Sequence, residues 1–117
     1  MAIVRGPLAN IATLPSTVGA IYTNPASTKT FIKGVTLFNG NTSPETVKLY
    51  NVPNSGGSVG TAAATNQFTE ISLVAKETFF YEFPGDGIAL GSTNDSIQGV
   101  TTTANLVTYQ WSGVKDA

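Results

Sequence analysis

The sequence predicts a single-domain all-β fold with about eight short strands, of the sandwich or barrel type. Three observations lead to this prediction. Runs rich in β-branched and aromatic residues recur along the 117 residues, turn residues separate these runs, and helical periodicity is hard to find. Such spacing is typical of sandwiches and barrels. A chain of this length is expected to fold around one core.

The expected strands span residues 8–14, 19–22, 30–38, 46–52, 66–74, 77–83, 96–102 and 105–113. We interpret residues 1–18 as an N-terminal arm or edge strand and residues 19–117 as the sandwich domain. An extended arm can add a strand to its own sheet, to a sister subunit or to another protein through backbone pairing. The sequence leaves these three arrangements open.

The clearest pattern lies in residues 30–53, where "TFIKGVTLF" and "TVKLYNV" flank the turn-rich segment "NGNTSPE". Two strands joined by such a segment predict a hairpin. Side chains alternate between the two faces of a strand. One face of this hairpin is therefore predicted to enter the core, and it carries Val35, Leu37, Val47 and Leu49.

The segment "PNSGGSVGTAAATNQ", residues 53–67, consists almost entirely of small residues. This composition is typical of a mobile surface loop, and the loop either crosses from one sheet to the other or becomes ordered against a partner. Because the core does not need these residues, we include four of them among the candidate partner contacts. They are Ser55, Gly56, Gly57 and Val59.

The segment "TFFYEF", residues 78–83, places Phe79, Tyr81 and Phe83 on one face of a strand and Phe80 on the other. Two interpretations remain open. A strand covered on both faces explains all four aromatic side chains. Alternatively, Phe80 is exposed and contacts another subunit, since aromatic residues are enriched at interface centres. Phe80 is therefore a candidate contact with a partner.

Composition argues against several classes of function. The formal net charge is −1 and the six basic residues are scattered, so no phosphate-binding patch is expected and nucleic acid is not an expected partner. The chain has neither His nor Cys, which excludes Ser-His-Asp and Cys-His mechanisms and the usual zinc sites. No apolar run is long enough for a secretory signal or a membrane span, so neither is expected.

We therefore expect a protein that is not an enzyme, with no catalytic residue, no cofactor and no metal. A pair of carboxylates remains as an alternative, because two such groups suffice for glycoside hydrolysis. No donors accompany the available acids in a way that points to catalysis. These acids are Glu70, Glu77, Glu82, Asp86 and Asp95. The segments "PGDG" and "NDS" fit turns better than a calcium loop.

The order of segments resembles that of small all-β virion proteins of tailed bacteriophages, a group that includes capsid cement or decoration proteins and some tail or fibre modules. The segments that carry the resemblance are "IYTNPA", "IKGVTLFN", "NTSPE", "VKLYNVP", "VAKETFFYEFPGDGI" and "LVTYQWSGV". The resemblance implies an antiparallel β-sandwich of jelly-roll-like type without catalytic residues. It also implies a structural role on the outer capsid surface of the virion, after synthesis in the host bacterial cytoplasm.

The partners that this resemblance implies are the major capsid protein and further copies of the chain, as a dimer or trimer. Besides the small-residue loop and Phe80, the candidate contacts include the apolar part of the arm, namely Ile3, Val4 and Leu8. The alternative function is a tail fibre or receptor-binding module that contacts host surface glycan. Its contacts would be Trp111, Tyr109 and the "GSTNDS" loop.

Overall fold

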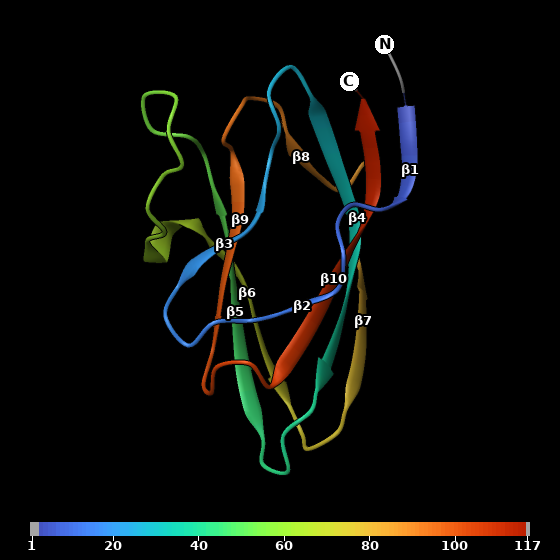
Figure 1. Cartoon of the computed structure of the whole chain (residues 1–117), viewed down its shortest axis with the longest axis vertical. Helices are drawn as coiled ribbons and strands as arrows, with labels where there is room; N and C mark the ends of the chain where they lie inside the picture. The colour runs from blue at the N-terminus through green and yellow to red at the C-terminus, as the bar shows by residue number, and fades with distance from the viewer. Residues whose placement is uncertain (1–2, 117) are drawn as a thin grey trace.

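The chain forms two antiparallel sheets that face each other across one core (Figure 1). The computed structural model describes residues 3–116, with side chains for residues 8–116. Sheet A has the order β1-β10-β4-β7, with β2 beside β10 and β8 beside β4, and sheet B has the order β3-β9-β5-β6. The predicted antiparallel β-sandwich is confirmed.

The strands are β1 (Ile3–Pro7), β2 (Ala12–Thr13), β3 (Gly19–Thr23), β4 (Lys29–Asn39), β5 (Glu45–Val52), β6 (Gln67–Leu73), β7 (Thr78–Glu82), β8 (Ile88–Leu90), β9 (Ser96–Thr101) and β10 (Val107–Asp116). A short 3-10 helix, η1 (Ala64–Asn66), precedes β6.

The sequence pattern missed β1 and β8, and the strand predicted for residues 8–14 reduces to the two residues of β2. β1 reads "IVRGP", whose Arg, Gly and Pro are weak strand signals, and β8 has three residues after a tight turn. Both form because β10 and β4 are long enough to offer backbone partners beyond their other neighbours. The remaining predicted strands correspond to β3, β4, β5, β6, β7, β9 and β10.

The four core positions predicted from residues 30–53 are buried, but the hairpin is wrong. Val35 and Leu37 lie on β4 in sheet A, and Val47 and Leu49 lie on β5 in sheet B. β4 pairs with β10, β7 and β8, whereas β5 pairs with β6 and β9. The two strands therefore meet across the core through side chains, and residues 40–44 carry the chain from one sheet to the other.

A buried amide organises this crossing between the sheets. The Asn39 Nδ2 donates hydrogen bonds to the carbonyl oxygens of Ser43, Leu73 and Val74, at 3.0, 3.2 and 3.1 Å. Its Oδ1 accepts a hydrogen bond from the backbone N–H of Asn41. Because a buried amide is costly unless its partners are present, these bonds hold the turn in one shape.

A β-bulge divides β4 into two halves. Ser112 of β10 pairs with Gly34 and Gly113 pairs with Ile32, so Lys33 has no partner in β10. An unpaired residue reverses which face each following side chain occupies. The buried β4 side chains are accordingly Thr30 and Ile32 before the bulge, and Val35, Leu37 and Asn39 after it.

Gly113 is required at this bulge because a Cβ there would lie 2.1 Å from the Phe31 carbonyl oxygen. The close approach of the two backbones explains why β10 can follow β4 through the irregularity. Together β4 and β10 carry the centre of sheet A, and Trp111 of β10 is among the largest fully buried side chains.

In the described part of the chain, no helix is long and apolar enough to cross a membrane.

Candidate functional site

The N-terminal arm adds a strand to the protein's own sheet. β1 pairs antiparallel with the end of β10, from Ile3 opposite Asp116 to Pro7 opposite Ser112. The backbone N–H of Leu8 then donates to the Trp111 carbonyl oxygen at 3.0 Å. Of the three arrangements left open by the sequence, the structure shows pairing within the chain.

The three arm residues named as candidate contacts differ in their placement. Leu8 is buried in the core, so in this fold its side chain is not on the surface where a partner would meet it. The side chains of Ile3 and Val4 lie outside the described residues, and these two contacts stay predictions. Replacing or removing the arm would disturb sheet A itself, because β1 occupies an edge of β10.

The small-residue loop joins neighbouring strands β5 and β6 of sheet B, so the prediction of a crossing between sheets is wrong. Its tip is a tight turn in which the N–H groups of Ser55 and Ser58 each donate to the other residue's carbonyl oxygen, at 2.7 and 3.1 Å. Gly56 and Gly57 have φ values of 60° and 89°. Two consecutive positive φ angles favour glycine, which explains the "GG" at the tip.

Side chains of the turn between β8 and β9 hold this loop in place. Asp95 Oδ1 accepts hydrogen bonds from both the backbone N–H and the Nδ2 of Asn54, each at 2.9 Å. Asn94 Nδ2 donates to the Gly57 carbonyl oxygen at 2.8 Å. The loop is thus ordered by its own chain, and no partner is needed to shape it.

The second half of the loop is held from β9. Gln98 Nε2 donates to the Gly60 carbonyl oxygen at 2.8 Å, and a Cβ at Gly60 would lie 2.5 Å from the Pro53 carbonyl oxygen. The neighbouring Val59 side chain is 42% exposed. This combination presents a valine to solvent on a fixed backbone, so Val59 remains available as a contact.

Phe80 is also available as a contact for a partner. β7 is the last strand in the order of sheet A, and Phe80 lies on its outer face with 73% of its surface exposed, whereas Phe79 and Phe83 pack against the core. Inward-facing aromatic rings form a row, with centroids 4.9 Å apart for Tyr81 and Phe83. The alternative in which both faces of this strand are covered is therefore wrong.

The candidate contacts do not form one patch. β1 and β7 lie at opposite ends of the order of sheet A, and the 53–66 loop belongs to sheet B (Figure 1). A partner that touched all three regions would have to surround the molecule. Separate neighbours, each meeting one side, fit this distribution better.

A buried carboxylate that the sequence analysis did not single out lies at the start of β5. Glu45 is 2% exposed, and its Oε1 accepts hydrogen bonds from Thr101 Oγ1 at 3.0 Å and the Thr103 N–H at 2.8 Å. Its Oε2 accepts one from Asn41 Nδ2 at 2.9 Å. Burial alone would raise the pKa of Glu45, but these hydrogen bonds outweigh it and the pKa is lowered.

The Asp95 carboxylate also accepts several hydrogen bonds from loops of the same chain. Burial would raise its pKa, but hydrogen bonds from Asn54, Ser92 and Gly91 outweigh this effect and the pKa is lowered. Its Oδ1 faces Asn54, and its Oδ2 accepts the N–H of Ser92 at 3.0 Å. The Asp95 oxygens that accept these hydrogen bonds hold the loops in place. The lowered pKa does not suit a general acid, because a general acid needs a raised pKa.

Two other acids named in the sequence analysis lie in exposed ion pairs. Lys48 Nζ is 3.9 Å from Glu70 Oε1, and Lys33 Nζ is 3.9 Å from Asp86 Oδ1. Exposed pairs of this kind contribute little to stability. Glu45 and Asp95 therefore anchor loops, whereas Glu70 and Asp86 lie on the solvated surface.

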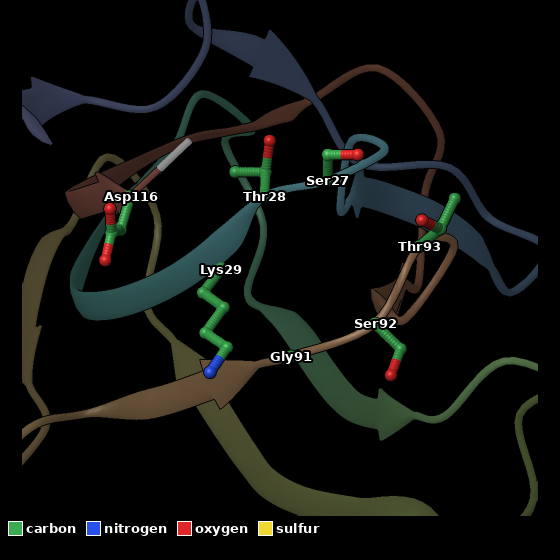
Figure 2. A pocket seen from close by; sticks show the side chains of 7 residues that line it. All are labelled: Ser27, Thr28, Lys29, Gly91, Ser92, Thr93 and Asp116. Carbon is green, nitrogen blue, oxygen red and sulfur yellow. The ribbon is translucent and has the colours of Figure 1, made fainter. Parts of the chain in front are cut away.

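An open depression of about 560 Å³ lies between the start of β4, the end of β10 and the loop after β8. Figure 2 shows Lys29 and Asp116, which occupy paired positions in β4 and β10, with the Lys29 ammonium group directed away from Asp116 and hydroxyl side chains around them. Those side chains belong to Ser27, Thr28, Ser92 and Thr93. The lining offers hydrogen bonds and one pair of opposite charges.

The two aromatic residues proposed as a glycan platform are not on the surface. Trp111 is 1% exposed, and Tyr109 is 8% exposed with its hydroxyl donating to the Ile21 carbonyl oxygen at 3.1 Å. Both belong to the core that faces sheet B. Of the predicted glycan contacts, the "GSTNDS" loop is the part that lines a depression.

No known protein family and no curated protein matches this chain. A solved structure described as "Bacillus endospore appendages form a novel family of disulfide-linked pili" aligns with 97% of this chain and 86% of its own. The identity is 19% and the TM-score is 0.46.

Glu45 is the residue that the sequence reasoning missed. The sequence does contain a signal for it. Glu45 follows Pro44 and begins a strand in which buried and less buried residues alternate, so it lies on the same face as Val47 and Leu49. An acid on the apolar face of a strand requires internal partners, because an unpaired buried charge is costly. The threonines that supply two of them, at 101 and 103, are more than fifty residues away along the chain.

Proposed function

We propose that this chain is a non-enzymatic structural protein of a phage particle, a capsid cement or decoration protein. It binds the outer head surface and stabilises contacts between major capsid subunits. The observation that carries the non-enzymatic part is the use of two carboxylates, since the buried Glu45 and the half-buried Asp95 accept hydrogen bonds from the chain's own loops. The resemblance of the strand and turn segments supports the location on the virion.

The distribution of exposed apolar side chains supports binding to several neighbours. Those in or near the predicted contact regions lie in the arm region, in the 53–66 loop and on β7, and they are Ile11, Val59 and Phe80. A cement protein bridges subunits that are correctly placed only in the assembled shell, so contacts that are weak singly hold firmly together.

The test compares binding of the purified protein to expanded mature heads and to isolated major capsid subunits of the phage that carries this chain. Tighter binding to heads is expected, with little loss in high salt, because few charges contribute and ion pairs would be screened. Decorated heads should resist heat better than bare heads. Imaging that places the protein at the tail tip instead would contradict the proposal.

A pair of variants sharpens this test. Val59→Lys changes a predicted contact, and Val74→Lys changes a valine of similar or greater exposure that was not among the predicted contacts. Head binding should fall for Val59→Lys and persist for Val74→Lys. Deletion of the arm is unsuitable, because it would remove β1 from sheet A and Leu8 from the core.

The alternative is a tail fibre or receptor-binding module that contacts host surface glycan. The hydroxyl-lined depression beside the "GSTNDS" loop favours it, and the burial of Trp111 and Tyr109 argues against the stacking contacts that it would use. Binding to host-surface polysaccharide that is lost in Thr93→Lys would support this alternative over the cement function.

A further inference from the structure

β7 presents an open edge with unused backbone groups. In its pairing with β4, Glu77 accepts a hydrogen bond from the Asn39 N–H at 2.9 Å, and the Phe83 N–H donates to Lys33 at 2.8 Å. Backbone groups alternate in direction along a strand. The odd-numbered residues of β7 therefore point their N–H and C=O groups to β4, and Thr78, Phe80 and Glu82 point theirs away from the sheet.

The other edge strands of at least five residues carry features that hinder pairing with a further strand, while the edge strands β2 and β8 have two and three residues. β1 contains Arg5 and ends at Pro7, β3 has a register shift around Ile21, and β6 has Glu70 in its middle and a register shift at Phe68. Charges, prolines and bulges are the usual means of protecting an edge.

β7 differs from these edges. Its five described residues run in unbroken register with β4 and include no proline, lysine or bulge. The single charge within it, Glu82, stands at its last position. At its centre, Phe80 has the largest exposed fraction among the large hydrophobic side chains of the described residues. The edge with the least protection thus carries the most exposed aromatic side chain.

We propose that β7 pairs antiparallel with β7 of a second copy of this chain, about a twofold axis at Phe80. Phe80 then lies opposite Phe80 of the second copy, and Thr78 lies opposite its Glu82. This register uses the outward backbone groups of all three residues and extends sheet A continuously across the dimer. The inference goes beyond the proposed function and does not depend on binding to a capsid.

Charge complementarity favours this antiparallel arrangement. Glu82 and Lys76 are both exposed and stand at opposite ends of β7. In the proposed register, Glu82 lies diagonally across from Lys76 of the second copy, within reach of long side chains. A parallel arrangement would instead bring like charges together at each end. Lys76 lies in the turn two residues before β7, and its Nζ donates one hydrogen to the Gly40 carbonyl oxygen at 2.6 Å, which leaves two hydrogens for a partner. Glu77, next to Lys76, uses Oε1 to accept the Val74 N–H at 2.8 Å.

The length of β7 sets the strength of the pairing. Five residues of antiparallel strand extend about 17 Å. Such an edge provides less contact than the roughly 800 Å² per partner of a stable complex. The isolated protein should therefore dimerise weakly and reversibly, and copies held side by side on a common surface should pair much more completely.

Cysteine cross-linking tests the register directly, because the chain has no cysteine of its own. Facing residues in a hydrogen-bonded antiparallel pair have Cα atoms about 5.5 Å apart, within the disulfide range of about 4.4–6.8 Å. A mixture of Thr78→Cys and Glu82→Cys proteins should oxidise to mixed dimers. Thr78→Cys alone should not, since two copies of residue 78 would lie about 13 Å apart along the strands.

Ile11→Cys serves as the collision control, because Ile11 is exposed to a similar degree as Phe80 but lies outside β7. Mixed dimers that form no faster than Ile11→Cys dimers would overturn the proposal. Faster cross-linking of Thr78→Cys with itself than with Glu82→Cys would also overturn it, because it requires a different register.

A second measurement uses variants without cysteine. Sedimentation equilibrium of the purified protein should show concentration-dependent dimers that are lost in Phe80→Lys, which places two ammonium groups at the twofold axis. Val74→Lys adds the same charge at an exposed valine outside β7 and should dimerise as the natural chain does. Equal association of the two variants would overturn the proposal. Neither measurement involves a capsid, so failure here is distinguishable from failure of the cement function.

Discussion

The interior between β4 and β5 and the edge strand β7 both carry large apolar side chains but have opposite surroundings. Leu37 on β4 and Leu49 on β5 are at most 1% exposed, whereas Phe80 on β7 is 73% exposed. β4 has neighbours on both sides in sheet A and sheet B in front of it, while β7 ends the order of sheet A. The difference lies in the position of each strand in its sheet.

This comparison separates stability from interaction. Apolar area that is removed from water within the sandwich stabilises the fold, at roughly 25 cal/mol per Å². Phe80 has not yet removed its area from water, so its contribution is available to a partner. Substitutions in the interior should therefore change the free energy of unfolding, whereas substitutions at the edge should change self-association.

In the interior, Leu37→Ala or Leu49→Ala should lower the free energy of unfolding by about 2–5 kcal/mol, because each leaves a cavity between the sheets. Urea denaturation of the purified protein measures this loss. Val74→Ala, at an exposed position, provides the matched control and should change little. A loss below about 1 kcal/mol for both leucines would show that the two sheets do not pack through these residues.

At the rim of the interior, Glu45→Gln should cost about 1–3 kcal/mol, because an amide nitrogen would replace one of the oxygens that accept hydrogen bonds from Asn41, Thr101 and Thr103. Glu70→Gln removes an exposed carboxylate paired with Lys48 and should cost far less. Equal effects of the two variants in urea denaturation would contradict the anchoring role of Glu45.

The contribution of Glu45 should also depend on pH. The pKa of Glu45 is lower in the folded protein than its ordinary value of 4.5, so the folded state favours the charged form. The stabilisation is fully present above pH 4.5 and is lost as the pH falls through the lowered folded-state pKa. The stability difference between the natural chain and Glu45→Gln should therefore shrink below pH 4.5, as measured by denaturation across a pH series.

At the edge, Phe80→Ser should change the free energy of unfolding by less than about 0.5 kcal/mol, because the side chain is largely in water in the single chain. Its effect should appear in self-association, which depends on this edge. A large loss of stability in a dilute, monomeric sample would show that Phe80 packs within its own sandwich, and the contrast between interior and edge would not hold.

Alternation and turn residues were enough to predict the strand-rich fold and most of its strands. In β5 they also identified Val47 and Leu49 as buried, because the period of two continues unbroken through this part of the strand. In β4 the alternation changes at the bulge opposite Gly113, which brings Ile32 and Val35 to the same side. The bulge depends on the close approach of β10, so the β4 sequence alone does not predict it.

The candidate contacts were predictable only in part for the same reason. Phe80 was named from its parity, but parity alone did not tell whether a second layer covered it. Leu8 was named as part of a free arm, and only its placement beside Trp111 shows that it completes the core. Burial of a side chain at a chain terminus depends on which strand the terminus meets.

The sequence by itself determined the secondary structure class and the absence of histidine and cysteine chemistry, because these follow from composition and local periodicity. Only the tertiary structure decided that β4 and β5 lie in opposite sheets, since a short polar connection can close a hairpin or bridge two sheets. It also decided that β7 is an edge and that Glu45 is an anchor. These features depend on neighbours brought together from distant parts of the chain, and backbone hydrogen bonds form equally well with any strand of matching geometry.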